Sequence, residues 1–287
     1  MQQYGQQTGG HDNTLFTEQD HNILLKFQPD NSPENEAYKT FTTRANEWAP
    51  FLPKYFGTKV IENKTYLLME NLTARFSQPC VLDIKMGKKS SAPDASEQKK
   101  EIQYKKALST TGLSHGLRII GMKKYDHVTK NVVTYPKSFG AGLDNMDKVR
   151  LSLTHFFSAA CPHTATSEQI VNETFQQSMI EADLMQAQIN RNAIQSVISQ
   201  LQNLRDFMCS PPKTKFNFYS SSLLITFDGA IPNSGDVSTK MIDFQHVFEQ
   251  VPESVAYGED DGYIDGLNNL ISVLQEILSQ EQLLKQS

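Results

Sequence analysis

The chain has 287 residues, of which 38% are hydrophobic and 21% charged, a composition that excludes wholesale disorder and predicts about two domains or lobes. The 27 Lys and Arg against 32 Asp and Glu leave a net charge of −5, which argues against a general nucleic-acid-binding protein. We find no apolar run of membrane-spanning length and no secretory signal, so we expect no membrane partner. Three widely spaced cysteines, without a zinc or disulfide spacing, favour a protein of the cytoplasm that could also enter the nucleus.

The first 76 residues predict a tail followed by a small lobe. Residues 1–15 are rich in Gln and Gly, which is typical of a loose tail. A short apolar run over 22–27 predicts a strand, and a Ser-Pro pair predicts the start of a helix over 33–48. Residues 62–64 fit a hairpin turn between two further strands. This β–α–β–β order indicates a small lobe over 16–76.

The remaining residues, 77–287, predict a larger lobe of mixed helices and strands. The expected elements are a basic helix, two paired strands, a long helix, two more strands and a final amphipathic helix, over 97–108, 121–125, 131–135, 167–208, 216–227, 240–244 and 267–277. The fold class is therefore α+β in two lobes, with no internal repeat.

The segment from Pro79 to Gly87 (PCVLDIKMG) carries the first candidate site. Alternate residues of a strand share a face, so Asp83 and Lys85 lie side by side if this segment is a strand. Gly87 then lets the backbone turn immediately afterwards. The pattern indicates a carboxylate and an ammonium group facing a cleft. An exposed strand with an ion pair between the two residues fits the same pattern equally well.

Asp243 follows the last strand-like piece and is the second candidate. Its neighbours Ile242 and Phe244 are expected to point into the core, which places the carboxylate on the opposite face. Mg²⁺ needs only one or two protein carboxylates when phosphate oxygens and water complete its coordination. Asp243 could therefore hold a metal beside a nucleotide, although an aspartate at a strand end is more often a local cap. Ser222, in a run of three serines, carries no signal alone.

Residues 85–130 form a strongly basic segment. They hold eleven Lys and Arg against four Asp and Glu, a local balance of +7 that leaves −12 for the rest of the chain. Such a field suits a small polyanionic substrate. A solvated lysine-rich helix is the alternative. An RNA-binding patch is a weaker one, because Tyr104 is the only aromatic residue near the helix on which bases could stack.

Three of these elements, in the same order, resemble the signature of the inositol polyphosphate kinase family. Pro79, Asp83, Lys85 and Gly87 match its P-x-x-x-D-x-K-x-G motif, while residues 222–224 and 242–244 match its S-L-L and I-D-F elements. Residues 69–73 (MENLT) resemble the adenine hinge of the family. Residues 94–97 with the lysine-rich helix resemble the inositol hexakisphosphate kinase branch. The resemblance covers about 22–280 and is weakest in the tail and over 144–208.

The resemblance implies a two-lobed α+β fold distantly similar to protein kinases, with a β-rich small lobe. It implies ATP- and Mg²⁺-dependent transfer of the γ-phosphoryl group to inositol hexakisphosphate. Catalytic roles fall on Asp83 and Lys85, and metal-binding roles on Asp243 and Ser222. The implied nucleotide-binding residues are Lys26, with Glu34 or Glu36 as its helix partner, and Glu70, Leu72, Asp83 and Asp243. The candidate ligands of the inositol phosphate are Lys85, Lys88, Lys89, Lys99, Lys106, Arg118 and His246.

Two other functions stay open at this point. A multikinase would phosphorylate hydroxyl groups of lower inositol phosphates or of a lipid, with Asp83 as the nearest base. A non-enzymatic module would only bind polyphosphates. Lys88 with Lys89, Ile102 and His115 depart from the pattern of the branch, and they bear on the substrate contacts and substrate breadth. We expect a monomer, because no apolar heptad pattern is left once the core faces are used.

Overall fold

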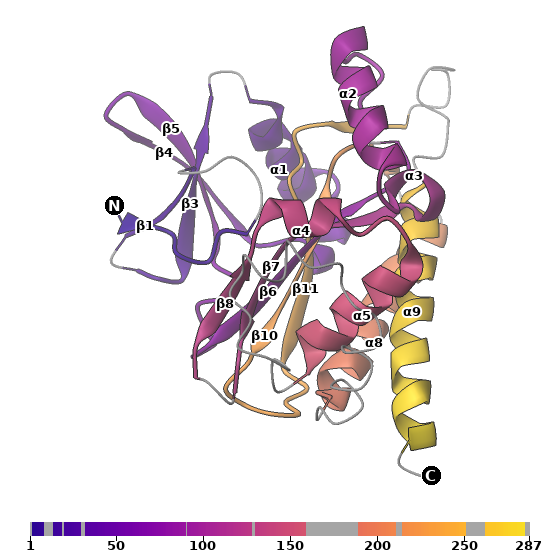
Figure 1. The fold of residues 1–287 in the computed structure, drawn as a ribbon. Coiled ribbons are helices and arrows are strands. Elements are labelled where there is room, and N and C mark those ends of the chain that lie inside the picture. Colours follow the sequence, from indigo (N-terminus) through magenta and orange to yellow (C-terminus); the bar gives the residue numbers. More distant parts are fainter. Residues whose placement is uncertain are drawn as a thin grey trace.

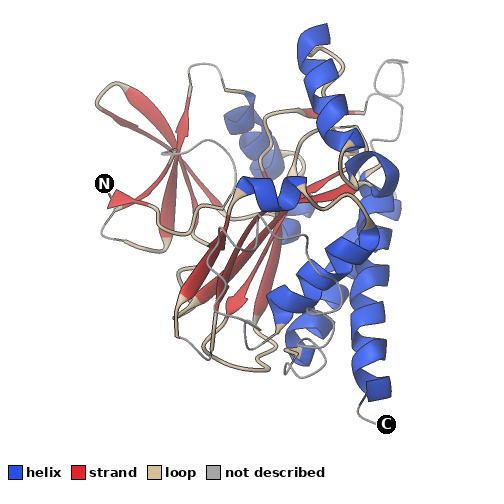
Figure 2. Ribbon diagram, in the orientation of Figure 1, coloured by secondary structure: helices blue, strands red, loops and turns tan. Residues whose placement is uncertain are grey.

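The computed structural model describes residues 2–8, 14–18, 20–29, 32–89, 91–127, 130–158, 189–210, 214–250 and 262–284. A β-rich lobe carries the N terminus, and a larger lobe combines a second sheet with most of the helices (Figures 1 and 2). This arrangement confirms the predicted α+β, two-lobed fold. In the described parts of the chain, none of the helices has the length and apolarity to cross a bilayer.

The small lobe is built on one antiparallel sheet in the order β1-β2-β3-β5-β4. Its strands are Gln2–Gln3, Leu15–Thr17, Ile23–Gln28, Tyr55–Ile61 and Lys64–Glu70, numbered β1 to β5 along the chain. The β4–β5 turn places Glu62 and Asn63 at φ angles of 50° and 59°. Two successive residues of positive φ match the right-handed twist of a hairpin. The predicted hairpin is confirmed.

The N-terminal segment differs from the loose tail that composition predicted. Gln2 and Gln3 pair with Thr17 and Phe16, so that β1 forms the edge of the small sheet. A two-residue strand of glutamines has no alternating pattern, and only its distant partner makes it a strand. The described part of the tail, residues 2–8, therefore belongs to the small lobe.

The helix predicted over 33–48 is shorter than expected. Helix α1 spans Pro33–Thr43, and a 3₁₀ helix, η1, follows over Asn46–Phe51. Pro50 cannot donate to an α-helical ladder, which favours the tighter and shorter form. The apolar side chains of both helices, Tyr38, Phe41 and Trp48, are buried.

The large lobe contains a five-stranded antiparallel sheet in the order β11-β10-β6-β7-β8. Its strands are β6 (Pro79–Met86), β7 (Leu117–Tyr125), β8 (Val132–Tyr135), β10 (Ser222–Asp228) and β11 (Val237–Ile242). A separate pair joins β9 (Phe216–Phe218) to β12 (Val247–Glu249). The predicted strand over 216–227 is thus two strands, divided where Ser220 adopts a φ of 60°. Strand β6 is central and nearly all buried.

Helices cover the large lobe. They are α2 (Glu97–Leu108), α3 (Gly112–His115), α4 (Lys137–Ala141), α5 (Met146–Phe157), α8 (Arg191–Cys209) and α9 (Tyr263–Leu284). Helix α2 has the predicted bounds, and the Ser96 side chain caps it by accepting from the Lys99 N–H. Helix α8 confirms the end of the helix predicted over 167–208, whose residues 167–188 lie outside the described residues. The pattern did not predict α5.

Candidate functional site

One row of side chains crosses four strands of the large sheet. From β7 through β6 and β10 to β11, directly opposed residues are Arg118, Lys85, Ser222 and Ile242. Opposed residues on neighbouring antiparallel strands point to the same face. Asp243 follows Ile242 at the end of the row. The register thereby brings a guanidinium, an ammonium and a hydroxyl group onto one face, with Asp243 directly after its last strand.

Asp83 lies on the same face, two residues before Lys85, and is 3% exposed. Because β6 is an inner strand of the sheet, an exposed strand with a surface ion pair is excluded. Burial, and after it the negative charge of Asp243, raise the pKa of Asp83 from its usual 3.8 to about 7. The nearby Ser222 hydroxyl and the ammonium groups of Lys85 and Lys26 oppose this rise without cancelling it.

A left-handed backbone conformation presents Asp243 to the site. Its φ is 65°, in a region that non-glycine residues rarely adopt. The chain turns there, and Phe244 packs among core aromatic rings, 5.2 Å from the centroids of both Tyr38 and Phe41. Ile242 does not point into the core as predicted, because it opposes Ser222 and is only half-buried. Strand alternation ends at Ile242, so it could not place Asp243.

Lys26 connects the two lobes at this site. From β3 its Nζ donates to Glu34 Oε1 at 2.8 Å and to Asp243 Oδ1 at 2.5 Å. Burial alone would lower the pKa of Lys26, but Asp243 and Glu34 outweigh it and raise that pKa. Burial alone would raise the pKa of Asp243, but the charge of Lys26 outweighs it and holds the pKa of that carboxyl below its usual value. Lys26 therefore stays cationic and Asp243 anionic.

Glu34 is the helix partner of Lys26, which settles the choice between Glu34 and Glu36. Glu34 is fully buried, and its second oxygen accepts from Gln28 Nε2 at 3.1 Å and from Gln245 Nε2 at 2.9 Å. Glu36 is exposed and pairs with Lys39 instead. The two glutamines complete the hydrogen bonding of a buried carboxylate, which its burial requires. Neither glutamine stood out in the sequence.

The site offers polar atoms that a ligand could satisfy. Asp83 Oδ1 and Ser222 Oγ are buried and have no hydrogen-bond partner among the described residues. Buried polar atoms normally have one, so these two are available to a metal or a nucleotide. No group of three or more His, Cys, Asp or Glu able to hold a metal occurs among the described residues. A hard cation bound here would need phosphate oxygens and water besides Asp243 and Ser222, which is the coordination that Mg²⁺ prefers.

Cationic side chains gather on the other side of Lys85. Burial first, and then the charges of Arg118 and Lys106, lower the pKa of Lys85, against the effects of Asp243 and Asp83. Across the described chain, Lys85, Lys106 and Arg118 take part in no ion pair. Lys85 and Arg118 are half-buried, and charges removed from water are usually paired, so these cations are suited to an anionic ligand.

Lys99 and His246 extend the cation cluster towards α2. Lys99 Nζ lies 3.1 Å from His246 Nε2. Burial, followed by the charge of Lys99, lowers the pKa of His246, with a smaller effect in the same direction from Lys85. The imidazole is therefore a neutral partner of the ammonium group. We define the cation cluster as Lys85, Lys99, Lys106 and Arg118 together with their neutral neighbour His246.

Lys88 differs from Lys85, Lys106 and Arg118 in that it already has an anionic partner. Lys88 forms an ion pair with Asp265 on α9. It also lies against Gly262, where a Cβ atom would come within 2.7 Å of the Lys88 side chain. Asp265 was missed in the sequence because no spacing pattern links residues 177 positions apart. Substrate binding by Lys88 and Lys89 stays a prediction.

The predicted hinge residues border a cavity between the lobes. It has a volume of about 220 Å³ and is lined by both Glu70 and Leu72. Lys54 and Phe56 contribute from the small lobe and Ser238 from β11. The adenine-binding role of Glu70 and Leu72 stays a prediction.

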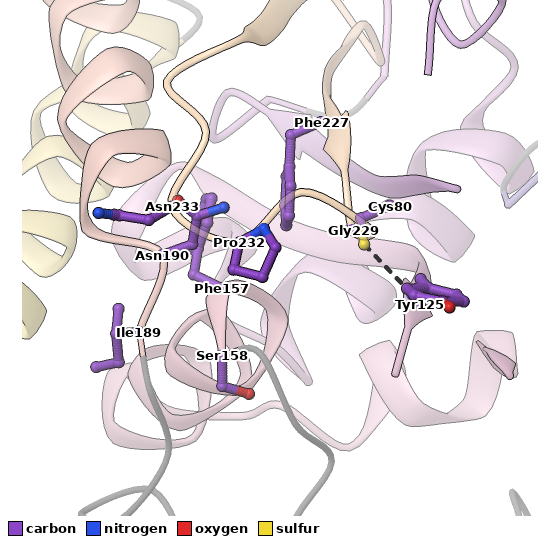
Figure 3. A pocket seen from close by; sticks show the side chains of 10 residues that line it. All are labelled: Cys80, Tyr125, Phe157, Ser158, Ile189, Asn190, Phe227, Gly229, Pro232 and Asn233. Atoms are coloured by element: carbon purple, nitrogen blue, oxygen red, sulfur yellow. Dashed lines mark hydrogen bonds between the residues drawn. The ribbon is translucent and has the colours of Figure 1, made fainter. Parts of the chain in front are cut away.

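A second cavity lies elsewhere on the large sheet (Figure 3). It is bounded by Cys80, Phe157, Phe227 and Gly229, and the Tyr125 N–H donates to Cys80 Sγ across 3.3 Å. Its volume is only about 10 Å³, which is close to the space of one water molecule. None of the residues that line it belongs to the site above, so we treat it as a packing defect.

Comparison with known proteins identifies the family. The model of the family described as inositol polyphosphate kinase matches residues 66–275. The mouse protein inositol hexakisphosphate kinase 3 is 32% identical over 233 residues, which are 75% of this chain and 52% of the relative. The chain thus spans about half the length of that protein. Inositol polyphosphate multikinase alpha of Arabidopsis thaliana is 28% identical over 236 residues, which are 79% of this chain and 75% of the relative.

Solved structures support the same fold. An inositol phosphate multikinase structure is 26% identical, with a TM-score of 0.62 over 85% of this chain and 99% of that chain. The multikinase of S. cerevisiae, solved in complex with ADP and Mn²⁺, is 23% identical and resembles this fold with a TM-score of 0.64 over 88% of this chain and 99% of that chain. The family match covers most of the sequence, and the two-lobed structure agrees with it. The chain belongs to the inositol polyphosphate kinase family.

Proposed function

We propose that the chain transfers the γ-phosphoryl group of ATP to an inositol phosphate, with inositol hexakisphosphate as the preferred acceptor. One observation carries the proposal: within the part of the chain that the structure describes, three members of the cation cluster form no ion pair, and they adjoin buried oxygen atoms that lack hydrogen-bond partners. Phosphoryl transfer requires alignment and neutralisation of charge more than covalent participation of the protein. Membership of the family supports the same reaction.

On the nucleotide side, the proposed roles are those that the family resemblance implies. Glu70 and Leu72 would hold adenine at the hinge, and Lys26 would contact the phosphates from β3. Asp83 would bind the ribose or organise the centre. Asp243 and Ser222 would hold Mg²⁺, which when bound neutralises charge on the transferring phosphoryl group. Glu34 fixes the Lys26 ammonium so that it faces Asp243.

On the acceptor side, Lys85 lies between the two groups of residues. Its ammonium would bridge the acceptor and the transferring phosphoryl group, while Lys106, Arg118, Lys99 and His246 bind the remaining phosphates. A phosphate acceptor is already ionised, so it needs no strong general base. The more phosphates the acceptor carries, the more of these cations it neutralises. This favours the hexakisphosphate.

One observation supports a multikinase as the second candidate. The pKa of Asp83 is raised to about 7 by burial and by Asp243. A general base works best when its pKa is near the operating pH, so Asp83 is suited to accept a proton from a hydroxyl group. The relative from Arabidopsis thaliana bears the multikinase name.

A substrate panel decides between these functions. The protein is incubated with ATP, Mg²⁺ and inositol phosphates of rising phosphate number, and products are separated by anion-exchange chromatography. We expect a product more anionic than inositol hexakisphosphate, and none with Asp243→Asn. A strong preference for acceptors with free hydroxyl groups would select the multikinase. Tight polyphosphate binding without ATP turnover would leave only a binding module.

A further inference from the structure

The N-terminal segment of residues 2–8, here called the strap, is fastened to the hinge by one side chain. Tyr4 is half-buried, and its hydroxyl lies 3.0 Å from Asn71 Oδ1 and 2.7 Å from Thr73 Oγ1. These two residues flank Leu72. The Tyr4 backbone N–H donates to the Leu15 carbonyl at 2.9 Å and continues the pairing of β1 with β2.

Asn71 is the centre of a small polar network at the hinge. Its amide Nδ2 donates to the His21 carbonyl at 2.7 Å, and its Oδ1 accepts from the Thr73 N–H at 3.1 Å. Both Asn71 and Thr73 are buried. Burial raises the pKa of Tyr4 to about 12, against a smaller opposite effect of Thr73. The phenol is therefore a neutral hydrogen-bonding group at physiological pH. It binds Asn71 and Thr73, the two residues that flank Leu72 in the hinge.

The strap then reaches the large lobe. Lys123 on β7 donates from Nζ to the Gly5 carbonyl. Two residues before it, Gly121 touches the strap so closely that a Cβ atom would lie 2.1 Å from the Thr8 carbonyl oxygen. Gly121 is directly opposite Asp83 in the sheet, so the strap passes over the site face. In Figure 1 the indigo trace leaves β1 in the direction of the large sheet.

These contacts join three parts that must keep their positions for a nucleotide to bind: the small sheet, the hinge and strand β7. We infer that the strap positions the hinge for nucleotide binding and that Tyr4 is its positioning residue. The expected effect on ATP kinetics rests on the proposed function. The expected effect on the order of the hinge does not depend on it. Tyr4 acts through Asn71 and Thr73 and touches no reacting atom.

The test compares Tyr4→Phe with wild type in the full chain. Phenylalanine keeps the ring and removes the hydroxyl, so the hydrogen bonds to Asn71 and Thr73 are both lost. We expect amide hydrogen exchange over residues 70–76 to accelerate in the nucleotide-free protein. We expect the KM for ATP to rise about 3- to 10-fold, with kcat and the KM for the inositol phosphate unchanged. Tyr104→Phe is the matched control, because Tyr104 is 55% exposed on the outer side of α2.

A second variant reaches the strap from the other end. Gly121→Ala introduces a methyl group that clashes with the Thr8 carbonyl oxygen. Amide hydrogen exchange should therefore accelerate over residues 2–8 as well as over 70–76. Wild-type exchange and wild-type ATP KM in Tyr4→Phe would overturn the inference. An equal loss of kcat and of both substrate affinities, together with a lower Tm, would also overturn it and reduce Tyr4 to general packing. If wild type itself turns over no ATP, the proposed function fails, and the exchange measurement still decides the role of the strap.

Discussion

Asp83→Asn tests the electrostatics of the site most sharply. Asn keeps the shape of the buried carboxyl but cannot ionise. The pKa of Asp83 is raised to about 7, chiefly by burial and then by Asp243, whereas an unfolded chain gives it the usual 3.8. The folded protein therefore binds this proton more tightly than the unfolded chain does. Its stabilising effect is fully present below about pH 4 and is lost as the pH rises through about 7.

The magnitude follows from the same two values. A rise of about 3 pKa units corresponds to about 4 kcal/mol, at about 1.4 kcal/mol for each unit. Wild type should lose stability relative to Asp83→Asn by up to about 4 kcal/mol between pH 4 and pH 8. The variant is thus expected to be the more stable protein at pH 8 and yet inactive. This is typical when a functional group that destabilises the fold is removed.

Urea unfolding at pH 4, 5.5, 7 and 8, without nucleotide or metal, measures this difference. Titrating groups that do not interact with Asp83 contribute equally to both proteins and cancel. The control is Asp147→Asn on α5, whose side chain is 69% exposed and whose stability should stay within about 0.5 kcal/mol of wild type at each pH. A difference between Asp83→Asn and wild type that does not change with pH would refute the assignment of Asp83 as a buried acid.

Three further predictions concern the ion pairs and cations of the site. Asp243→Asn should lower kcat by about 100-fold or more in a steady-state ATP assay, and full turnover would disprove its metal role. Lys85→Ala should abolish turnover without lowering Tm, because Lys85 is a largely buried cation with no ion pair; unfolding would instead indicate a structural role. Glu34→Gln should destabilise the protein by about 3 kcal/mol in urea unfolding, since it breaks a buried ion pair. The matched Glu36→Gln should change stability by under about 0.5 kcal/mol, and equal effects of the two substitutions would contradict the assignment.

Local signals in the sequence predicted those elements that neighbouring residues determine. The bounds of α2 follow from its Ser96 cap, and the β4–β5 turn from residues that tolerate positive φ. The resemblance carried by the ordered motifs also grouped Asp83, Lys85, Ser222 and Asp243 in one site. The strand register brings the first three together, and the left-handed turn at Asp243 adds the fourth. Local signals were sufficient for α2 and the β4–β5 turn, whereas the grouping of the site residues came from the resemblance.

Contacts between distant residues were not predictable in this way. The strap forms because Gln2 and Gln3 meet β2 and because Tyr4 meets a hinge 67 residues away. Nothing in the spacing indicates that Lys88 pairs with Asp265, or that Asp243 turns left-handed and thereby breaks strand alternation. Each of these depends on tertiary packing, which overrides local preference.

The most direct test of the central claim is ³¹P NMR of the reaction with ATP, Mg²⁺ and inositol hexakisphosphate. If the cation cluster binds the acceptor phosphates and Lys85 bridges to ATP, a new pair of coupled diphosphate signals should appear on the inositol product. Asp243→Asn should give none. An unchanged hexakisphosphate spectrum with the wild-type protein, under conditions where the protein is folded, would contradict the account.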